Sequence, residues 1–146
     1  MTRVLKMNEP SLKHVRAFCD GRGFSYFNLF GKLGDGQINI GNLHSGIVKA
    51  FHYHNLQTDY WFCIKGDIRV ICVSPDRSIV KNFYIGEHNP AILEIPPGWL
   101  HGYKNVSSDT STLLYWVTKE YNPQNPDEER VAWDFLGKEL WDVENI

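Results

Sequence analysis

The chain has 146 residues, of which 42% are hydrophobic and 14% aromatic, and its formal net charge is −2. This length suits one domain with a substantial core, so we expect a single domain over residues 1–146. Acidic and basic residues are interspersed, and this pattern excludes a basic stripe for nucleic acid or an anionic membrane surface. No apolar run approaches the length of a membrane span, and the first residues lack the apolar core of a secretory signal. We therefore expect a cytoplasmic protein without a membrane partner.

Apolar and polar residues alternate along the middle of the chain, and Gly, Asn, Asp and Pro interrupt the pattern. This period of two predicts successive β-strands within 37–42, 46–54, 59–66, 67–76, 78–86, 91–105 and 111–121. Residues 65–67 and 74–77 have the composition of hairpin turns. A short helix is expected only within residues 127–143, where acidic residues begin the segment and Gly137 interrupts it. Short strands at this spacing predict an all-β sandwich or barrel with a minor terminal helix.

The cysteines indicate no redox or metal motif. Cys19, Cys63 and Cys72 are an odd number of thiols without CxxC spacing. Cys63 and Cys72 alternate with apolar neighbours in predicted strands, which is typical of reduced thiols in a core.

Polar side chains with acid–base and metal-ligating chemistry occur in two segments, residues 46–66 and 95–105. Residues i and i+2 of a strand face the same side, so we expect His52 and His54 to enter one cavity. Asp59 begins the next predicted strand, and His101 lies in a later one. Buried polar groups need partners or a function, so the convergence of these residues predicts a site inside the sheets. The two segments resemble the signature blocks of cupins, which implies a double-stranded β-helix, or jelly roll.

Further motifs follow in chain order: Asp20-Gly21-Arg22-Gly23, Gln37-Ile38-Asn39, Lys49-Ala50-Phe51-His52, the segment 95–102 and the segment 115–123. In this order they resemble the motifs of the dTDP-4-keto-6-deoxyglucose 3,5-epimerases, over about residues 18–140. The resemblance implies an isomerase that acts on a nucleotide sugar in surface-polysaccharide synthesis. It also implies a homodimer with exchanged strands and a reaction that requires no cofactor.

The resemblance assigns roles to individual residues. It implies that His52 removes a proton next to the sugar ketone and that Tyr115 returns one from the opposite face of the ring, although LLYWV by itself is typical of a core strand. The residues that it implies in substrate binding are Arg22, Gln37, Asn39, Lys49 and His101.

Two positions depart from the epimerase motifs. The lysine that steadies the enolate oxygen falls at Asp59, and a carboxylate cannot stabilise an oxyanion. The arginine before the histidine is Lys49, which keeps the charge but lacks the bidentate fork. We also expect the aspartate that partners the histidine in the family to be missing before Ile146, so that His52 needs another orienting partner. Single epimerisation or keto migration therefore suits the sequence as well as double epimerisation.

The same residues support two other interpretations. Cupins place a carboxylate ligand at the position of Asp59, so His52, His54, Asp59 and His101 are a three-histidine, one-carboxylate set for iron, manganese, nickel or zinc. The enzyme would then be a metal-dependent dioxygenase or metal-assisted isomerase in which His52 is a ligand. The last interpretation is a non-catalytic sugar-binding module. Each side chain also has a structural alternative: a loop hydrogen bond for His54, a turn cap for Asp59 and a satisfied core position for His101.

Overall fold

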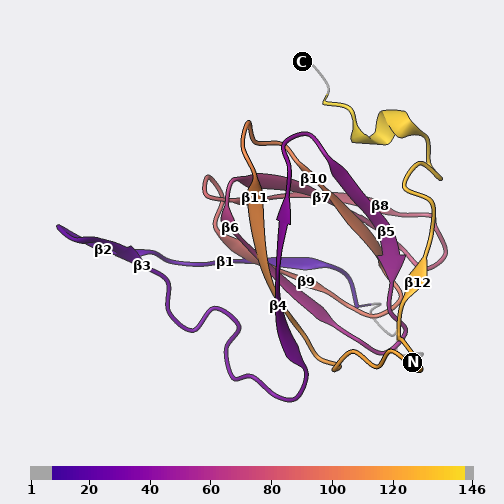
Figure 1. The fold of residues 1–146 in the computed structure, drawn as a ribbon, viewed down its shortest axis with the longest axis horizontal. Coiled ribbons are helices and arrows are strands. Elements are labelled where there is room, and N and C mark those ends of the chain that lie inside the picture. Colours follow the sequence, from indigo (N-terminus) through magenta and orange to yellow (C-terminus); the bar gives the residue numbers. More distant parts are fainter. Residues whose placement is uncertain (1–7, 144–146) are drawn as a thin grey trace, which may run out of the picture.

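The fold consists of two five-stranded antiparallel sheets that face each other (Figure 1). The computed structural model describes residues 8–143, so both ends of the predicted domain, 1–7 and 144–146, lie outside the described residues. The first sheet has the order β1 (Ser11–His14), β9 (Ala91–Ile95), β6 (Asp59–Lys65), β11 (Ser111–Val117) and β4 (Gln37–Leu43). The second sheet has the order β12 (Glu129–Arg130), β5 (Val48–Tyr53), β10 (Leu100–Asn105), β7 (Asp67–Val73) and β8 (Val80–Gly86). This architecture confirms the predicted all-β jelly roll.

The main core lies between the sheets, because both contribute inward side chains to one cluster. Trp61 and Leu93 come from the first sheet, and Val70 and Tyr103 come from the second. The thiols Cys63 and Cys72 belong to the same cluster and are buried and free, as predicted. Alternation along the strands produces this core, since every second side chain faces the opposite sheet.

A second cluster holds the end of the chain against the second sheet. Phe51, the neighbour of His52 in β5, packs its ring on Phe135 and Trp141, with centroids 5.2 and 5.3 Å apart. Trp141 is almost fully buried. Because successive side chains of a strand point to opposite faces, Phe51 anchors the C-terminal segment outside while His52 faces inward.

Two predicted features of the chain path need correction. Residues 65–67 do not form a hairpin, because β6 and β7 belong to opposite sheets. Gly66 has φ 73° and turns the chain from one sheet to the other, a backbone conformation that favours glycine. The predicted strand segment 91–105 is also two strands, since prolines and Gly98 separate β9 from β10. The hairpin predicted at 74–77 is confirmed, because Val73 pairs with Val80 across it.

The ends of the chain contain elements that the alternation did not predict. The short helix predicted within 127–143 is a 3₁₀ helix, η1 (Lys138–Trp141), which follows Gly137 with φ 90°, and strand β12 lies earlier in the same segment. Near the N-terminus, β2 (Phe18–Asp20) and β3 (Gly23–Ser25) form a hairpin, here called the arm, that projects away from the sheets (Figure 1). Within residues 8–143, none of the helices has the length and apolarity needed to cross a membrane.

Candidate functional site

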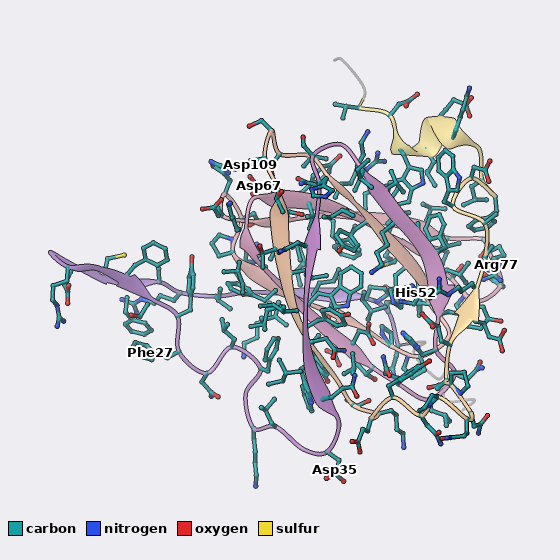
Figure 2. All side chains as sticks on the ribbon, in the orientation of Figure 1. Phe27, Asp35, His52, Asp67, Arg77 and Asp109 are labelled. Carbon is teal, nitrogen blue, oxygen red and sulfur yellow. The ribbon has the colours of Figure 1, made fainter. Side chains whose placement is uncertain are left out.

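A cavity of about 650 Å³ lies between the two sheets. This volume is within the range of small-molecule sites. Strands of both sheets line it, together with the C-terminal segment before and after β12. Of the predicted site residues, those that line the cavity are Gln37, Asn39, Lys49, His52, His54, Asp59 and Tyr115. Figure 2 places His52 among the side chains inside the fold and Phe27 out beside the arm.

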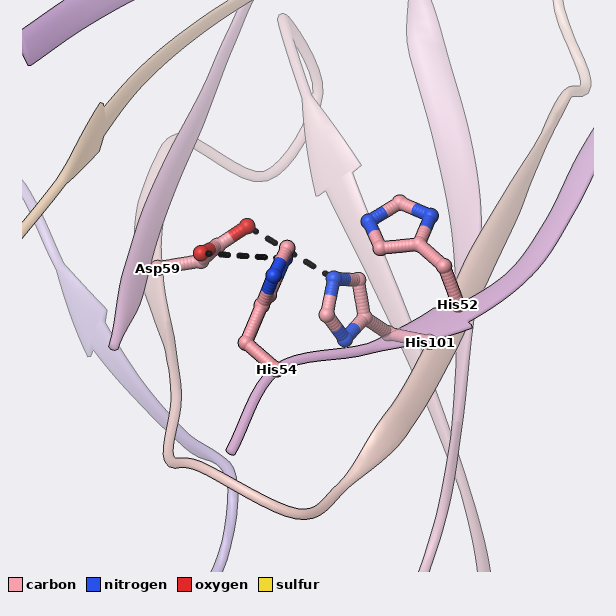
Figure 3. A group of neighbouring side chains, drawn as sticks. All are labelled: His52, His54, Asp59 and His101. Atoms are coloured by element: carbon pink, nitrogen blue, oxygen red, sulfur yellow. Dashed lines mark ion pairs between the residues drawn. The ribbon is translucent and has the colours of Figure 1, made fainter. Parts of the chain in front are cut away.

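Three histidines and one aspartate meet at the buried end of this cavity (Figure 3). His101 on β10 pairs with His52 on β5, and directly paired residues of antiparallel strands carry their side chains on the same face. His54 follows β5, and Asp59 begins β6 in the opposite sheet. One ligand atom from each of these four residues lies within 4.8 Å of those of the others. We call this group the histidine cluster.

Hydrogen bonds to the backbone fix the tautomers of two of these histidines. His54 Nδ1 donates to the Asp127 carbonyl at 2.5 Å, and His101 Nδ1 donates to the Trp99 carbonyl at 2.9 Å. A carbonyl oxygen only accepts, so Nδ1 carries the proton in both rings. Each Nε2 is thereby directed at Asp59, at 3.7 Å for His54 and 3.5 Å for His101. Two ring nitrogens and a carboxylate thus face one another, which is favourable when a proton or a metal cation lies among them.

The Asp59 carboxylate is held on its other side by two donors. Gln57 Nε2 donates to Oδ1 at 2.7 Å, and Trp61 Nε1 donates to Oδ2 at 3.0 Å. Burial alone would raise the pKa of Asp59, but the interactions with His101, His54 and Gln57 outweigh it and lower the pKa. Asp59 is therefore ionised in the folded protein at neutral pH. Within residues 8–143, its hydrogen bonds come from side chains inside the fold and not from the backbone of a turn.

His52 is uncharged at neutral pH. Burial, and then the electrostatic effect of His101 and His54, lowers the pKa of His52 to about 2. Its ring stands 4.3 Å from that of His101, centroid to centroid. A neutral imidazole has a free lone pair, which a metal ligand and a proton acceptor both require, although a pKa this low makes the ring a weak base.

The opposite wall of the cavity presents amides and a phenol. Tyr115 on β11 pairs with Asn39 on β4, and Gln37 Nε2 donates to Asn39 Oδ1 at 3.0 Å. Burial, and then the negative charges of Asp59 and Glu128, raise the pKa of Tyr115. The phenol therefore keeps its proton at neutral pH and is available as an acid. It also packs against the main core, which explains why its sequence context is typical of a core strand.

The structure does not bring Arg22 to this cavity. Arg22 lies on the arm with a side chain that is 91% exposed, and its guanidinium binds Asp20 at 2.5 Å. His101 is fully buried beside His52, at the closed end of the cavity. The predicted roles of both residues in substrate binding stay predictions.

The C-terminal segment contributes side chains that the sequence analysis missed. Glu128, Arg130 and Trp133 line the cavity, and none of them was among the predicted site residues. The orienting contact comes from the Asp127 carbonyl and reaches His54, whereas the prediction placed the need at His52. The Asp127 carboxylate also accepts the backbone N–H groups of residues 55–57 at 2.8 to 3.0 Å, which fixes the loop between β5 and β6.

Two facing antiparallel sheets around a buried polar cluster define a cupin, and solved structures share this fold. The dTDP-4-dehydrorhamnose 3,5-epimerase from Sulfolobus tokodaii superposes with a TM-score of 0.75 at 25% identity, covering 99% of this chain and 85% of that one. A dTDP sugar isomerase from Desulfovibrio desulfuricans G20 superposes with a TM-score of 0.77 at 18% identity, covering 87% and 86%. The predicted resemblance to these epimerases is therefore confirmed for the fold.

The chain belongs to the polysaccharide biosynthesis C-terminal domain family, whose model matches residues 18–129. It is 38% identical over 104 residues to the spore coat polysaccharide biosynthesis protein SpsL of Bacillus subtilis strain 168, covering 68% of this chain and 69% of that protein. It is 36% identical over 97 residues to a probable low-salt glycan biosynthesis epimerase of Haloferax volcanii, covering 62% of each. These relatives agree with the predicted class, an epimerase-like enzyme of polysaccharide synthesis.

Proposed function

We propose that this protein is a nucleotide-sugar epimerase or ketoisomerase that acts on a 4-keto-6-deoxyhexose carried by a nucleoside diphosphate. The observation that carries this proposal is the position of His52 and Tyr115 on facing walls of one cavity. Inversion next to a ketone requires one group that removes a proton and another that delivers one to the other face of the ring. The solved structures with this fold include dTDP-sugar enzymes, which supports a dTDP-linked substrate.

The proposed reaction balances with the groups in the cavity. His52 takes the proton from the carbon next to the ketone, and the electron pair moves to the ketone oxygen to give an enolate. The enolate carbon then accepts the phenol proton of Tyr115 on its other face. Water returns a proton to the phenolate and takes the proton from the His52 imidazolium, so that both groups are restored. Lys49 also lines the cavity and supplies positive charge for the enolate oxygen, a task that Asp59 cannot perform.

Solvent exchange tests this proposal directly. In heavy water, the protein should introduce deuterium next to the ketone of a 4-keto-6-deoxy sugar linked to dTDP or UDP, measured by NMR. His52→Ala should abolish the exchange. Tyr115→Phe should keep part of the exchange but block the inversion. Ring protons that do not exchange with either nucleotide sugar would contradict the proposal, and tight binding without any turnover would favour a sugar-binding module.

A second candidate function is metal-dependent catalysis at the histidine cluster. His101 Nε2 is buried and has no hydrogen-bond partner among the described residues, and such an atom needs an explanation. Three imidazoles and one carboxylate fit iron, manganese, nickel or zinc. His52, His54, Asp59 and His101 would hold the ion, and a bound ion would supply Lewis-acid polarisation of the ketone, or oxygen chemistry if it is iron.

Metal content separates the two functions. Protein purified without an affinity tag or added metal is analysed by elemental mass spectrometry beside the Asp59→Ala variant. Near one equivalent of a transition metal, lost in the variant, would make His52 a ligand and support the second function. Protein that is metal-free and cannot be loaded would leave His52 as the base of a metal-independent enzyme.

We further propose that the protein works as a homodimer in the cytoplasm, where nucleotide sugars are its small-molecule partners. The arm and the loop after it expose Phe18, Phe24 and Phe27, which is unusual for aromatic side chains without a covering surface. Light scattering after size-exclusion chromatography tests the dimer. A monomeric mass at micromolar concentration would contradict it.

A further inference from the structure

Strand β12 brings side chains of the C-terminal segment to the cavity. It pairs with β5 so that Arg130 lies opposite His52 and Glu129 lies opposite Tyr53. Because paired residues share a face and successive residues alternate, Arg130 faces the cavity with His52 and Glu129 faces away. Arg130 accordingly lines the cavity, and Glu129 does not.

The Arg130 guanidinium is available to a ligand. Its side chain is 81% exposed, and its ion pair with Glu128 is long, with Nη2 and Oε2 3.6 Å apart. Exposed ion pairs of this kind hold a side chain only weakly. A guanidinium has five N–H donors in a rigid fork, and this fork matches two phosphate oxygens at once.

Trp133 stands at the same rim on a backbone that is held in place. Residue Trp133 is 45% exposed and lines the cavity. The Trp133 carbonyl accepts a hydrogen bond from Trp141 Nε1 at 3.0 Å, and Trp141 is buried against Phe51. A flat, half-exposed aromatic side chain on an anchored segment is a stacking surface for a planar ring.

The cavity is thus divided by depth. Asp59 and His101 form a buried polar end, whereas Arg130, Trp133 and Lys119 form an exposed rim with cationic and aromatic chemistry. A nucleotide sugar has the same order of chemical groups, with a neutral sugar, then a diphosphate, then a planar base. The sugar ketone would reach the buried end when the diphosphate and the base bind at the rim.

We propose that Arg130 and Trp133 form the nucleoside diphosphate subsite, in which the guanidinium binds the diphosphate and the indole stacks on the base. This inference rests on the proposed function, because it takes a nucleotide sugar as the ligand. The positive charge that binds the diphosphate would then come from Arg130 in the C-terminal segment. The sequence had predicted that Arg22 on the arm supplies it. Arg130 and Trp133 bind and orient the substrate and take no part in proton transfer.

Isothermal titration calorimetry with dTDP and with UDP tests the subsite. Arg130→Gln should weaken binding about 10- to 100-fold, because a charge-assisted bidentate contact is lost. Arg130→Lys should recover part of the affinity, since it keeps the charge without the fork. Trp133→Ala should weaken binding about 10-fold, and Trp133→Phe should restore most of it. Lys13→Gln is the control, because it removes a positive charge from an exposed side chain of β1 that does not line the cavity.

The outcomes separate this inference from the proposed function. If the wild-type protein binds dTDP or UDP and both Arg130→Gln and Trp133→Ala bind equally well, the subsite is wrong while the nucleotide-sugar proposal stands. If the wild-type protein binds neither nucleotide, the nucleotide-sugar proposal fails and the subsite fails with it. Where turnover is measured, Arg130→Gln should raise KM about 10- to 100-fold and leave kcat within about twofold. Matching thermal unfolding curves of the variants establish that the losses are not due to unfolding.

Discussion

The cavity buries ionisable side chains, whereas the arm exposes aromatic ones to solvent. At the closed end of the cavity, the ionisable groups Asp59 and His101 are almost completely buried. On the arm, Phe24 is exposed and the guanidinium of Arg22 extends into solvent. Both regions match motifs of one enzyme family, but only the cavity has the strand pairing that brings those residues together. A family motif therefore predicts the position of a side chain well where the two sheets hold the strand that carries it. It predicts that position poorly on the arm, which is a hairpin outside the two sheets.

The cavity and the arm differ because burial removes water from polar groups. Buried polar groups are tolerated when they have partners, and Asp59 has Gln57, Trp61 and two histidines around it. Arg22 has one exposed partner, Asp20, two residues away. Changes in the cavity should thus disturb activity and stability strongly, and changes on the arm should leave the isolated fold almost unaffected.

The largest effect is expected from Tyr115→Phe. The substitution removes one hydroxyl and the acid that the proposed reaction needs, so kcat should fall about 10²- to 10⁴-fold with a small change in KM. Steady-state kinetics on the nucleotide sugar measures both constants. Tyr84→Phe removes the same atom from an exposed position on β8 and should keep wild-type activity. Equal kcat values for the two variants would exclude Tyr115 as the acid.

The next largest effect is expected on stability, from Asp59→Ala. This change leaves the buried Trp61 Nε1 without its acceptor and removes the negative charge between His54 and His101. We expect the free energy of unfolding to fall by about 2–4 kcal/mol, measured by urea denaturation. Asp59→Asn keeps the shape and one acceptor oxygen, so it should lose less. A wild-type midpoint for Asp59→Ala would show that the cluster adds nothing to the stability of the cavity.

The positions of several cavity residues could be predicted from the sequence, because the alternation of apolar and polar residues indicates which face of a strand is buried. The placement of His52 and His54 on one side followed from a period of two, and Asp59 followed as the first residue of the next strand. The pairing of His52 with His101 joins strands far apart in the chain, and only the family motif indicated it. The sheet change at Gly66 was missed because a tight turn with glycine is equally typical of a hairpin.

The C-terminal part of the site could not be predicted from local pattern. Strand β12 is two residues long, and two residues cannot show an alternation. Arg130 reaches the cavity because Phe135 and Trp141 pack on Phe51 and hold the segment beside β5. These are tertiary contacts, and the sequence offered only acidic residues that suggested a helix start. The missed residues are therefore those whose position depends on packing across the fold.

The pH dependence of stability should differ between the buried His52 and the exposed His88. The pKa of His52 is about 2 in the folded protein and near 6.5 when unfolded, so the unfolded chain binds the extra proton between these values. In metal-free protein, the contribution of neutral His52 to the free energy of unfolding should therefore be fully present above pH 6.5. It should fall by about 1.4 kcal/mol for each pH unit below that value. His52→Gln should reduce this slope, as measured by urea denaturation from pH 7 to 4.5.

An exposed histidine provides the opposite sign for comparison. The hydrogen bond to Asp67, and then the charge of that carboxylate, raise the pKa of His88. A raised pKa stabilises the fold at low pH, and the contribution is lost as the pH rises through the folded value. His88→Gln should thus lower stability slightly at acid pH and leave the steep part of the slope intact. If His88→Gln reduced the slope of unfolding free energy against pH as much as His52→Gln, the burial of His52 would not be the cause of that slope.

The smallest effect is expected from Arg22→Gln. Because the guanidinium is exposed and pairs only with nearby Asp20 on the arm, the urea midpoint of the monomeric fold should not change measurably. Binding of dTDP is the informative measurement, since it can depend on Arg22 only if the arm reaches a cavity other than the one in its own chain. A loss of affinity in Arg22→Gln that disappears at concentrations where the protein is monomeric would assign the arm to a partner's cavity. Unchanged affinity at every concentration would leave Arg130 as the guanidinium that binds the nucleotide, and the match of Arg22 to the family motif would then carry no chemistry in this chain.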